Sequence, residues 1–186
     1  MTGFVLRRAA AGIVILDEAY AEFAPDGWIA DAPCHAHLVV ARTMSKAFGL
    51  AGLRIGYAAA AASTITQIEK ARGPYMVGGV AERVALAALC DDLAWVRTHI
   101  DAAKESRARF GAELDEAGIP SLPSDANFVL VPVTDAAAVA AHMRAAGVAV
   151  RPFPRLRGIG DGVRITVGPW PMMDEALRAL RAAVQR

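Results

Sequence analysis

The stretch Val39–Tyr57, VVARTMSKAFGLAGLRIGY, holds a single lysine, Lys46, among small and apolar residues. A lysine ammonium in such surroundings needs a partner or a chemical purpose, because burying an unpaired charge is costly. The hydroxyl groups of Thr43 and Ser45 precede the lysine and Arg54 follows it, so the stretch offers hydrogen-bond donors to an anion such as a phosphate. Because a lysine amine forms a Schiff base with a carbonyl compound, the stretch predicts an aldehyde cofactor that carries a phosphate. The alternative is a surface lysine at the start of a helix.

The composition is typical of a well-packed α/β protein. Hydrophobic residues make up 55% of the 186 residues and charged residues 21%, which argues against disorder. The net charge of +1 gives no general attraction to nucleic acid or to an anionic membrane, so we expect neither as a partner. No uncharged apolar stretch is long enough to span a bilayer, and the N-terminus lacks a signal-peptide pattern, so we expect a cytoplasmic protein. We expect Cys34 and Cys90 to be buried or incidental thiols.

Three short apolar runs, at 13–16, 38–41 and 55–60, predict strands of one sheet. The first is typical of a parallel strand that is covered on both faces. It ends at Asp17–Tyr20, and the second run leads into Thr43. Ligands bind at the carboxyl ends of strands in open α/β sheets, so this edge is the predicted binding site.

Helical patterns follow the third run, and beyond Asn127 strand patterns appear again. Helices are predicted at about 63–72, at 80–90 as a buried helix, and from Asp91 or Asp92 to about 117. Beyond Asn127 we expect a second, smaller α/β unit with strands at 128–133, 148–151 and 163–167. A loop is expected between the strands at 148–151 and 163–167. A helix at 135–146, which Thr134 opens, and a final helix at about 172–184 complete this unit. We therefore expect two domains, residues 1–92 and 93–186, the second beginning with the long helix.

These motifs carry a family resemblance. Asp17-Glu-Ala-Tyr20, followed by Ser45-Lys46 and Arg54, resembles the fold-type-I pyridoxal-phosphate-dependent aminotransferases. The segment TMSKAFGLAGLRIGY is similar to the lysine segment of histidinol-phosphate aminotransferases and their relatives, and GVRITVG to their last strands. The resemblance implies an α/β fold, namely part of the large three-layer α/β/α cofactor-binding domain followed by a small C-terminal α/β domain.

The resemblance covers only the second half of such an enzyme, so we expect an N-terminally truncated chain. The first half would supply the glycine-rich phosphate loop and the aromatic residue that stacks on the cofactor. Without it, the incomplete sheet is expected to expose an apolar edge and face.

The resemblance also implies roles for residues at the sheet edge. Lys46 would hold pyridoxal 5'-phosphate covalently and then serve as general base and acid. Asp17 would keep the pyridine nitrogen protonated, and Tyr20 would donate a hydrogen bond to the phenolic oxygen of the cofactor. The alternatives are a helix-capping aspartate and an ordinary half-buried tyrosine.

Other polar residues are expected to bind anions. Ser45 and Arg54 would bind the cofactor phosphate, with Thr43 as a weaker third candidate. Arg164 lies within an apolar strand and must therefore be paired, which makes it the predicted anchor for the acidic group of the substrate. Arg151 is a second candidate there, with a structural ion pair as the alternative.

The implied reaction is amino transfer from histidinol phosphate to 2-oxoglutarate, a step of histidine biosynthesis, by an enzyme that is a homodimer at full length. An aromatic amino acid aminotransferase and a threonine-phosphate decarboxylase are the related alternatives, because the lysine segment is shared among them. A non-catalytic fragment is the alternative of another class. His35 and His37 lack further ligands nearby in the sequence, so we expect no metal site.

Overall fold

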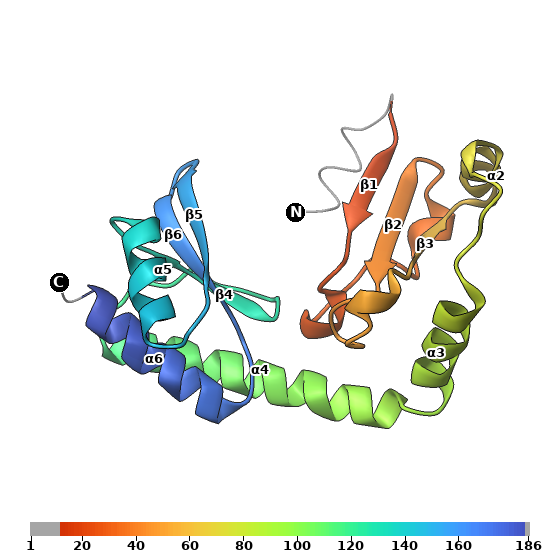
Figure 1. Ribbon diagram of the computed structural model, residues 1–186. Coiled ribbons are helices and arrows are strands. Elements are labelled where there is room, and N and C mark those ends of the chain that lie inside the picture. The colour runs from red at the N-terminus through yellow and green to blue at the C-terminus, as the bar shows by residue number, and fades with distance from the viewer. Residues whose placement is uncertain (1–11, 185–186) are drawn as a thin grey trace. The chain divides into compact units, whose positions relative to one another are not determined.

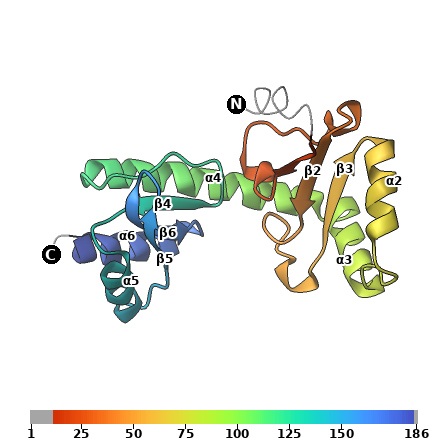
Figure 2. The same ribbon diagram turned by 90° about the horizontal axis from the view of Figure 1, so that it is seen from above.

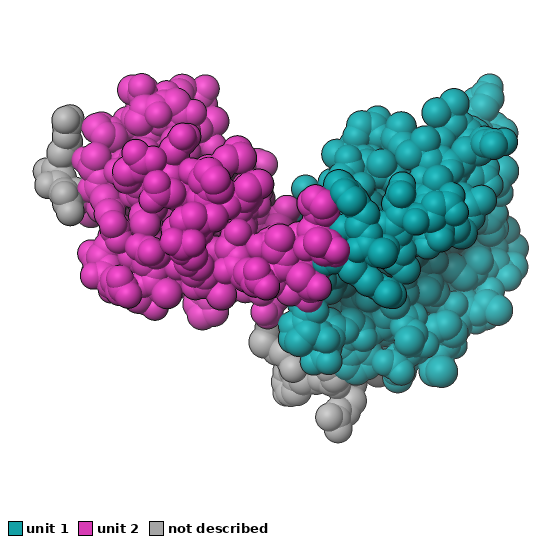
Figure 3. All heavy atoms as spheres, turned by 90° about the horizontal axis from the view of Figure 1, so that it is seen from below, with its two compact units in different colours: residues 1–97 teal, residues 98–186 magenta. Residues whose placement is uncertain are grey.

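A computed structural model describes residues 12–184, and the chain forms two compact units, residues 1–97 and 98–186 (Figure 3). The boundary falls within the long helix α4, Leu93–Glu116. The sequence before the first strand also predicts the tail of a helix, and this prediction falls outside the described residues. The domain limits expected from the sequence, 1–92 and 93–186, stay a prediction.

Unit 1 is built on a three-stranded sheet in the order β1-β2-β3 (Figure 1). Its strands are β1, Val14–Asp17; β2, Leu38–Thr43; and β3, Gly56–Ala60. β1 and β2 run parallel and β2 and β3 antiparallel, so β1 and β2 end at the same edge, where β3 begins. The three predicted strands are confirmed to within two residues.

One face of this sheet packs against the chain that connects β1 to β2. Leu38 and Val40 of β2 are fully buried there with Ala32, and Leu16 and Trp28 pack against them. The connection contains two short 3-10 helices, Ala21–Phe23 and Ala32–Cys34.

The opposite face of the sheet is only partly covered among the described residues. Helix α2, Ala62–Ala71, lies beside β3 (Figure 2). A hollow of about 620 Å³ remains between α2 and the sheet, lined by Ile13, Ile15 and Ile68 among others. Ile15 is 72% exposed, so the prediction that β1 is covered on both faces is wrong for this part of the chain, whereas the expected exposed apolar face is present.

The predicted burial of the helix at 80–90 is wrong. Helix α3, Gly79–Cys90, buries only a stripe of alanines, Ala81, Ala85 and Ala88, while Val80 is 74% exposed. Further apolar residues of α3, among them Leu86 and Leu89, are exposed, so the described chain covers only one side of the helix. Cys34 and Cys90 are both exposed, so of the two alternatives given for these cysteines, the buried thiol is excluded.

Unit 2 contains the second sheet, which is antiparallel throughout, in the order β4-β6-β5. Its strands are β4, Phe128–Pro132; β5, Arg151–Leu156; and β6, Gly160–Thr166. The predicted strand at 148–151 and the loop after it are wrong, because β5 and β6 form a hairpin over most of that loop. Pro152 and Pro154 indicated a loop, but β5 is an edge strand, where a missing N–H is tolerated.

The core of unit 2 lies on one face of this sheet. Side chains alternate along a strand, and Val129, Val131, Val163 and Ile165 are the buried set of β4 and β6. Helices α5, Ala136–Ala145, and α6, Trp170–Val184, pack against this face together with the C-terminal part of α4. Phe110, Leu114, Met143 and Leu180 are fully buried in the same core.

Helix α5 begins with a side-chain cap. The Asp135 carboxylate accepts a hydrogen bond from the backbone N–H of Ala138 at 2.9 Å. The predicted opening by Thr134 is therefore wrong by one residue. Gly147, with φ of 84°, follows the helix as expected for a C-terminal glycine.

Asp161 joins α5 to the β5–β6 hairpin, and we expect it to make unit 2 acid-sensitive. Its carboxylate accepts hydrogen bonds from the backbone N–H groups of Ala136 and Arg155, both at 3.0 Å, and these lower the pKa of Asp161. A lowered folded-state pKa gives stability above the unfolded-state pKa, and this stability is lost as the pH falls through the folded-state pKa. In Asp161→Asn the melting temperature should therefore fall less between neutral and acid pH than in the wild type.

Thermal unfolding followed at a series of pH values would measure this difference, with Asp125→Asn, at an exposed loop position, as the control. Identical pH profiles for wild type and Asp161→Asn would contradict the prediction.

Candidate active site

The candidate site lies where β1 and β2 end. Asp17 is the last residue of β1 and is paired in register with Ala41, two residues before the end of β2 at Thr43. The Asp17 side chain is exposed, and its Oδ1 accepts a hydrogen bond from the backbone N–H of Ala19 at 3.0 Å. Asp17 does not cap a helix, because the first 3-10 helix is preceded by Tyr20.

Lys46 and Tyr20 meet at this edge although they are far apart in the sequence. The Lys46 Nζ lies 5.4 Å from the centre of the Tyr20 ring, within the range of a cation–π interaction. The Lys46 side chain is exposed and Tyr20 is half-buried. The amine is therefore accessible to a ligand and lies against an aromatic hydroxyl-bearing ring.

Residues 44–55 form the loop that connects β2 to β3, and hydrogen bonds of Thr43, at the end of β2, hold the two ends of this loop together. Thr43 Oγ1 accepts a hydrogen bond from the Ser45 N–H at 3.1 Å and donates one to the Ile55 carbonyl at 3.4 Å. A Cβ atom at Gly56 would lie 2.6 Å from the Arg42 carbonyl oxygen, so only glycine allows β3 to start this close to β2. The Thr43 hydroxyl thus already has a structural role in holding the loop.

Arg54 leaves this loop with an unusual backbone. Its φ of 53° and ψ of 45° are left-handed, which is uncommon for a residue with a side chain. The exposed side chain donates a hydrogen bond from Nη1 to the Ala51 carbonyl at 3.1 Å. The guanidinium is thereby held over the same loop that contains Ser45 and Lys46, with donors remaining for an anion.

Glu18 and Arg42 form an ion pair that the sequence analysis missed. Arg42 Nη2 lies 2.8 Å from Glu18 Oε2, and the two side chains are 19% and 9% exposed. Burial alone would lower the pKa of Arg42, but the hydrogen bonds and charges of Glu18 and Tyr57 outweigh it and raise the pKa. The signal was available in the sequence, since Arg42 interrupts an apolar strand and needs a partner.

In unit 2, Arg164 and Arg151 lie directly opposite each other on β6 and β5. Strand alternation puts them on the sheet face opposite the core, and the Arg164 guanidinium lies 4.9 Å from the Phe128 ring and 5.9 Å from the Phe153 ring. The Arg151 guanidinium lies 5.1 Å from the Phe153 ring. The Arg164 Nε is buried and has no hydrogen-bond partner in the described chain.

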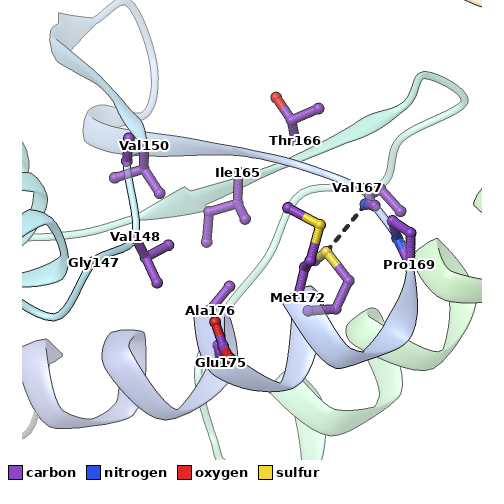
Figure 4. Close-up of a pocket in the computed structure, with 13 residues that line it drawn as sticks. Gly147, Val148, Val150, Ile165, Thr166, Val167, Pro169, Met172, Glu175 and Ala176 are labelled. Atoms are coloured by element: carbon purple, nitrogen blue, oxygen red, sulfur yellow. Dashed lines mark hydrogen bonds between the residues drawn. The ribbon is translucent and has the colours of Figure 1, made fainter.

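A separate hollow of about 480 Å³ in unit 2 carries little chemistry (Figure 4). It lies between the end of β6 and α6, and its walls are mainly apolar, including Val148, Ile165 and Met172. The Gly168 N–H donates a hydrogen bond to the Met173 sulfur at 3.3 Å, and both residues line the hollow. Glu175 is the one ionisable residue among the described residues that line it, so these residues form no acid–base pair.

In the part of the chain that the structure describes, residues 12–184, no group of three or more histidine, cysteine or acidic residues is placed to hold a metal ion. No helix in this range is long and apolar enough to cross a membrane.

Comparison with known proteins gives the same result as the motifs. The sequence matches the family described as aminotransferase class I and II over residues 5–180. The chain belongs to this family. The predicted resemblance and the α/β fold are thus confirmed, and the family depends on pyridoxal phosphate.

The relatives of this chain include aminotransferases named for two different substrates. The chain is 39% identical to an aromatic amino acid aminotransferase of Mycobacterium ulcerans, over 91% of this chain and 46% of the relative. It is 37% identical to histidinol-phosphate aminotransferase 1 of Dechloromonas aromatica, over 92% of this chain and 48% of the relative. The chain spans about half the length of the curated relatives it matches.

A solved structure shares the fold. Histidinol-phosphate aminotransferase from Sinorhizobium meliloti, in complex with pyridoxal-5'-phosphate, superposes with a TM-score of 0.81 at 30% identity. The match covers 98% of this chain and 52% of that chain.

Proposed function

We propose that this chain carries the cofactor-binding lysine and the substrate-binding arginines of a pyridoxal-phosphate-dependent aminotransferase. The observation that carries the proposal is the meeting of the Lys46 amine with the Tyr20 ring at the sheet edge where Asp17 ends β1. An exposed amine, a phenol and a carboxylate at one edge fit the groups of pyridoxal phosphate. Ser45 and Arg54 on the adjoining loop fit its phosphate.

Each residue has a distinct task in this proposal. When bound, pyridoxal phosphate supplies an aldehyde for covalent attachment and a ring that accepts electrons. The Lys46 Nζ would hold the cofactor through its aldehyde and, after the substrate amine takes its place, the free amine would remove the proton from the substrate α-carbon. The Asp17 carboxylate would keep the pyridine nitrogen protonated, and the Tyr20 hydroxyl would donate a hydrogen bond to the phenolic oxygen.

The anion-binding residues divide between cofactor and loop structure. The Arg54 guanidinium would bind the phosphate as a charged donor, and the Ser45 hydroxyl would bind it as a neutral donor. The Thr43 hydroxyl already donates to Ile55 and accepts from Ser45, so its contribution to the phosphate is indirect.

We propose that Arg164 and Arg151 bind the acidic group of the substrate. Like charges directly opposite each other on neighbouring strands are destabilising. No carboxylate forms an ion pair with either arginine in the described chain, and the Arg164 Nε lacks a partner. An anion bound between the two guanidiniums would relieve the repulsion and satisfy the buried nitrogen.

The pairing of two arginines favours a donor that carries a phosphate, because a dianion matches two cations better than one carboxylate does. We therefore place histidinol phosphate before phenylalanine and tyrosine as the amino donor, with 2-oxoglutarate as the acceptor. The names of the relatives support both kinds of donor. Threonine-phosphate decarboxylation is the third possibility, and a homodimer in the cytoplasm stays part of the proposal.

A donor panel tests this function. The protein, incubated with pyridoxal phosphate and 2-oxoglutarate, should form glutamate faster with histidinol phosphate than with phenylalanine or tyrosine. Release of carbon dioxide from threonine phosphate would instead identify a decarboxylase. Absence of any turnover, together with no covalent cofactor capture, would favour a non-catalytic fragment.

The substrate role of Arg164 predicts a large and selective effect. In Arg164→Met, the KM for the phosphate-bearing donor should rise about 10- to 100-fold, because a charge-assisted hydrogen bond to the anion is lost. Steady-state kinetics would measure this, with Arg157→Met, at an exposed turn position of the same hairpin, as the matched control. An equal rise in both variants would show a general electrostatic effect and contradict the assignment.

A further inference from the structure

We infer that Glu18 and Arg42 are a positioning pair, which fixes Asp17 and Tyr20 in the spacing that the cofactor requires. This inference deepens the proposed function and rests on it. Neither residue is assigned a role by the motifs, and neither lies among the candidate cofactor contacts.

Both oxygens of the Glu18 carboxylate accept hydrogen bonds. Its Oε2 accepts hydrogen bonds from Arg42 Nη2 at 2.8 Å and from Nε at 3.0 Å, and its Oε1 accepts a short hydrogen bond from the Trp28 backbone N–H. Both side chains are largely buried, at 9% and 19% exposure. Removing one charge of such a pair leaves the other charge buried and unpaired, so the pair is costly to break.

The pair lies on the opposite side of the sheet from Asp17. The Glu18 N–H donates to the Ala41 carbonyl at 2.8 Å and so extends the β1–β2 pairing one residue beyond Asp17. Side chains alternate along this segment, since Leu16 and Glu18 are half-buried while Ile15 and Asp17 are exposed. Glu18 therefore cannot contact a ligand held by Asp17, and it acts through the position of the backbone.

The same carboxylate also holds the segment that contains Tyr20. Residues 18–28 leave β1, and the bond from Glu18 to the Trp28 N–H ties the far end of this segment back to its start. A Cβ atom at Gly27 would lie 2.5 Å from Arg42 Nη2 and 3.1 Å from Glu18 Oε2, so the loop backbone lies directly on the pair. Tyr20 is thus enclosed in a loop whose two ends share one anchor.

Arg42 connects the anchor to the other half of the site. It immediately precedes Thr43 on β2, and its register partner on β3 is Tyr57. The pair therefore links the segment after β1 to β2, beside the start of β3. Asp17 and Tyr20 must reach two different atoms of one ring, and a misplacement of about 1 Å is enough to weaken such a contact strongly.

Amide exchange and cofactor affinity together test the inference. In Glu18→Gln, which preserves the shape of the side chain, exchange of the Ala19 N–H bonded to Asp17 should accelerate about tenfold, because a charged hydrogen-bond network is lost. The dissociation constant for pyridoxal phosphate should rise by about the same factor. Gly27→Ala, which displaces Arg42 from outside the pair, should have the same two effects.

Glu69→Gln is the matched control, because Glu69 forms a 2.8 Å ion pair with Arg72 that is about half exposed. Glu69→Gln should change neither the exchange rate of the Ala19 N–H nor the dissociation constant for pyridoxal phosphate. Unchanged Ala19 exchange in Glu18→Gln and Gly27→Ala, or equal changes in Glu69→Gln, would overturn the inference. If the wild type does not bind pyridoxal phosphate, the proposed function fails, and amide exchange alone still decides whether the pair positions Asp17.

Discussion

Replacement of Lys46 by alanine should abolish covalent capture of pyridoxal phosphate. The wild-type protein mixed with the cofactor should gain an absorbance band near the visible edge, and borohydride should convert it to a stable adduct on the peptide that contains Lys46. Alanine has no amine to form the bond, so no adduct should remain at this position. Absorbance and mass spectrometry before and after reduction would measure the loss.

Two further variants separate the covalent bond from the charge of Lys46. Lys46→Arg keeps a cation near the Tyr20 ring but has no reactive amine, so it should also fail to form the adduct. Lys70→Ala removes an exposed lysine of α2 and should leave the adduct unchanged. An adduct of equal yield in Lys46→Ala would show that the reaction is unspecific, and the proposed role of Lys46 would be wrong.

Replacement of Phe110 by alanine should lower the free energy of unfolding of unit 2 by about 3–5 kcal/mol, the usual cost of removing a buried aromatic ring. Phe110 is 0% exposed and belongs to the cluster that joins α4 to β4, β6, α5 and α6. The cavity would lie at the centre of this core, where neighbouring side chains on several elements limit relaxation. Denaturant unfolding monitored by amide exchange would measure the change in unit 2.

Phe153→Ala is the matched control for this core substitution. Phe153 is half-buried on the edge strand β5, so its loss should cost less than half as much. If Phe110→Ala and Phe153→Ala destabilised unit 2 equally, the core would not be centred where α4 meets the sheet.

Part of the fold followed from local pattern. The apolar runs before Asp17 and Thr43 predicted β1 and β2, because a short β-branched run has few other stable arrangements. Polar residues at both strand ends predicted a site at one edge, since parallel strands end together. Gly147 predicted the end of α5 through its backbone freedom alone.

Other features depend on what each element contacts. Pro152 and Pro154 predicted a loop, yet both belong to β5. A proline is tolerated there because β5 is an edge strand, where a missing backbone N–H need not break a hydrogen bond. The apolar residues of α3 predicted burial, yet burial depends on the neighbours of the helix, and only its alanine stripe is covered in the described chain. No local sequence pattern tells whether a strand lies at the edge of a sheet or which neighbours cover a helix.

The sequence by itself determined the family, the candidate lysine and the positions of β1, β2 and β3, because these depend on residue type and short spacing. Only the tertiary structure decided that Lys46 lies against Tyr20, that Arg151 opposes Arg164, and that Glu18 pairs with Arg42. Each of these contacts joins residues more than ten positions apart. Such contacts are set by strand register and loop closure, which the order of residues along the chain does not reveal.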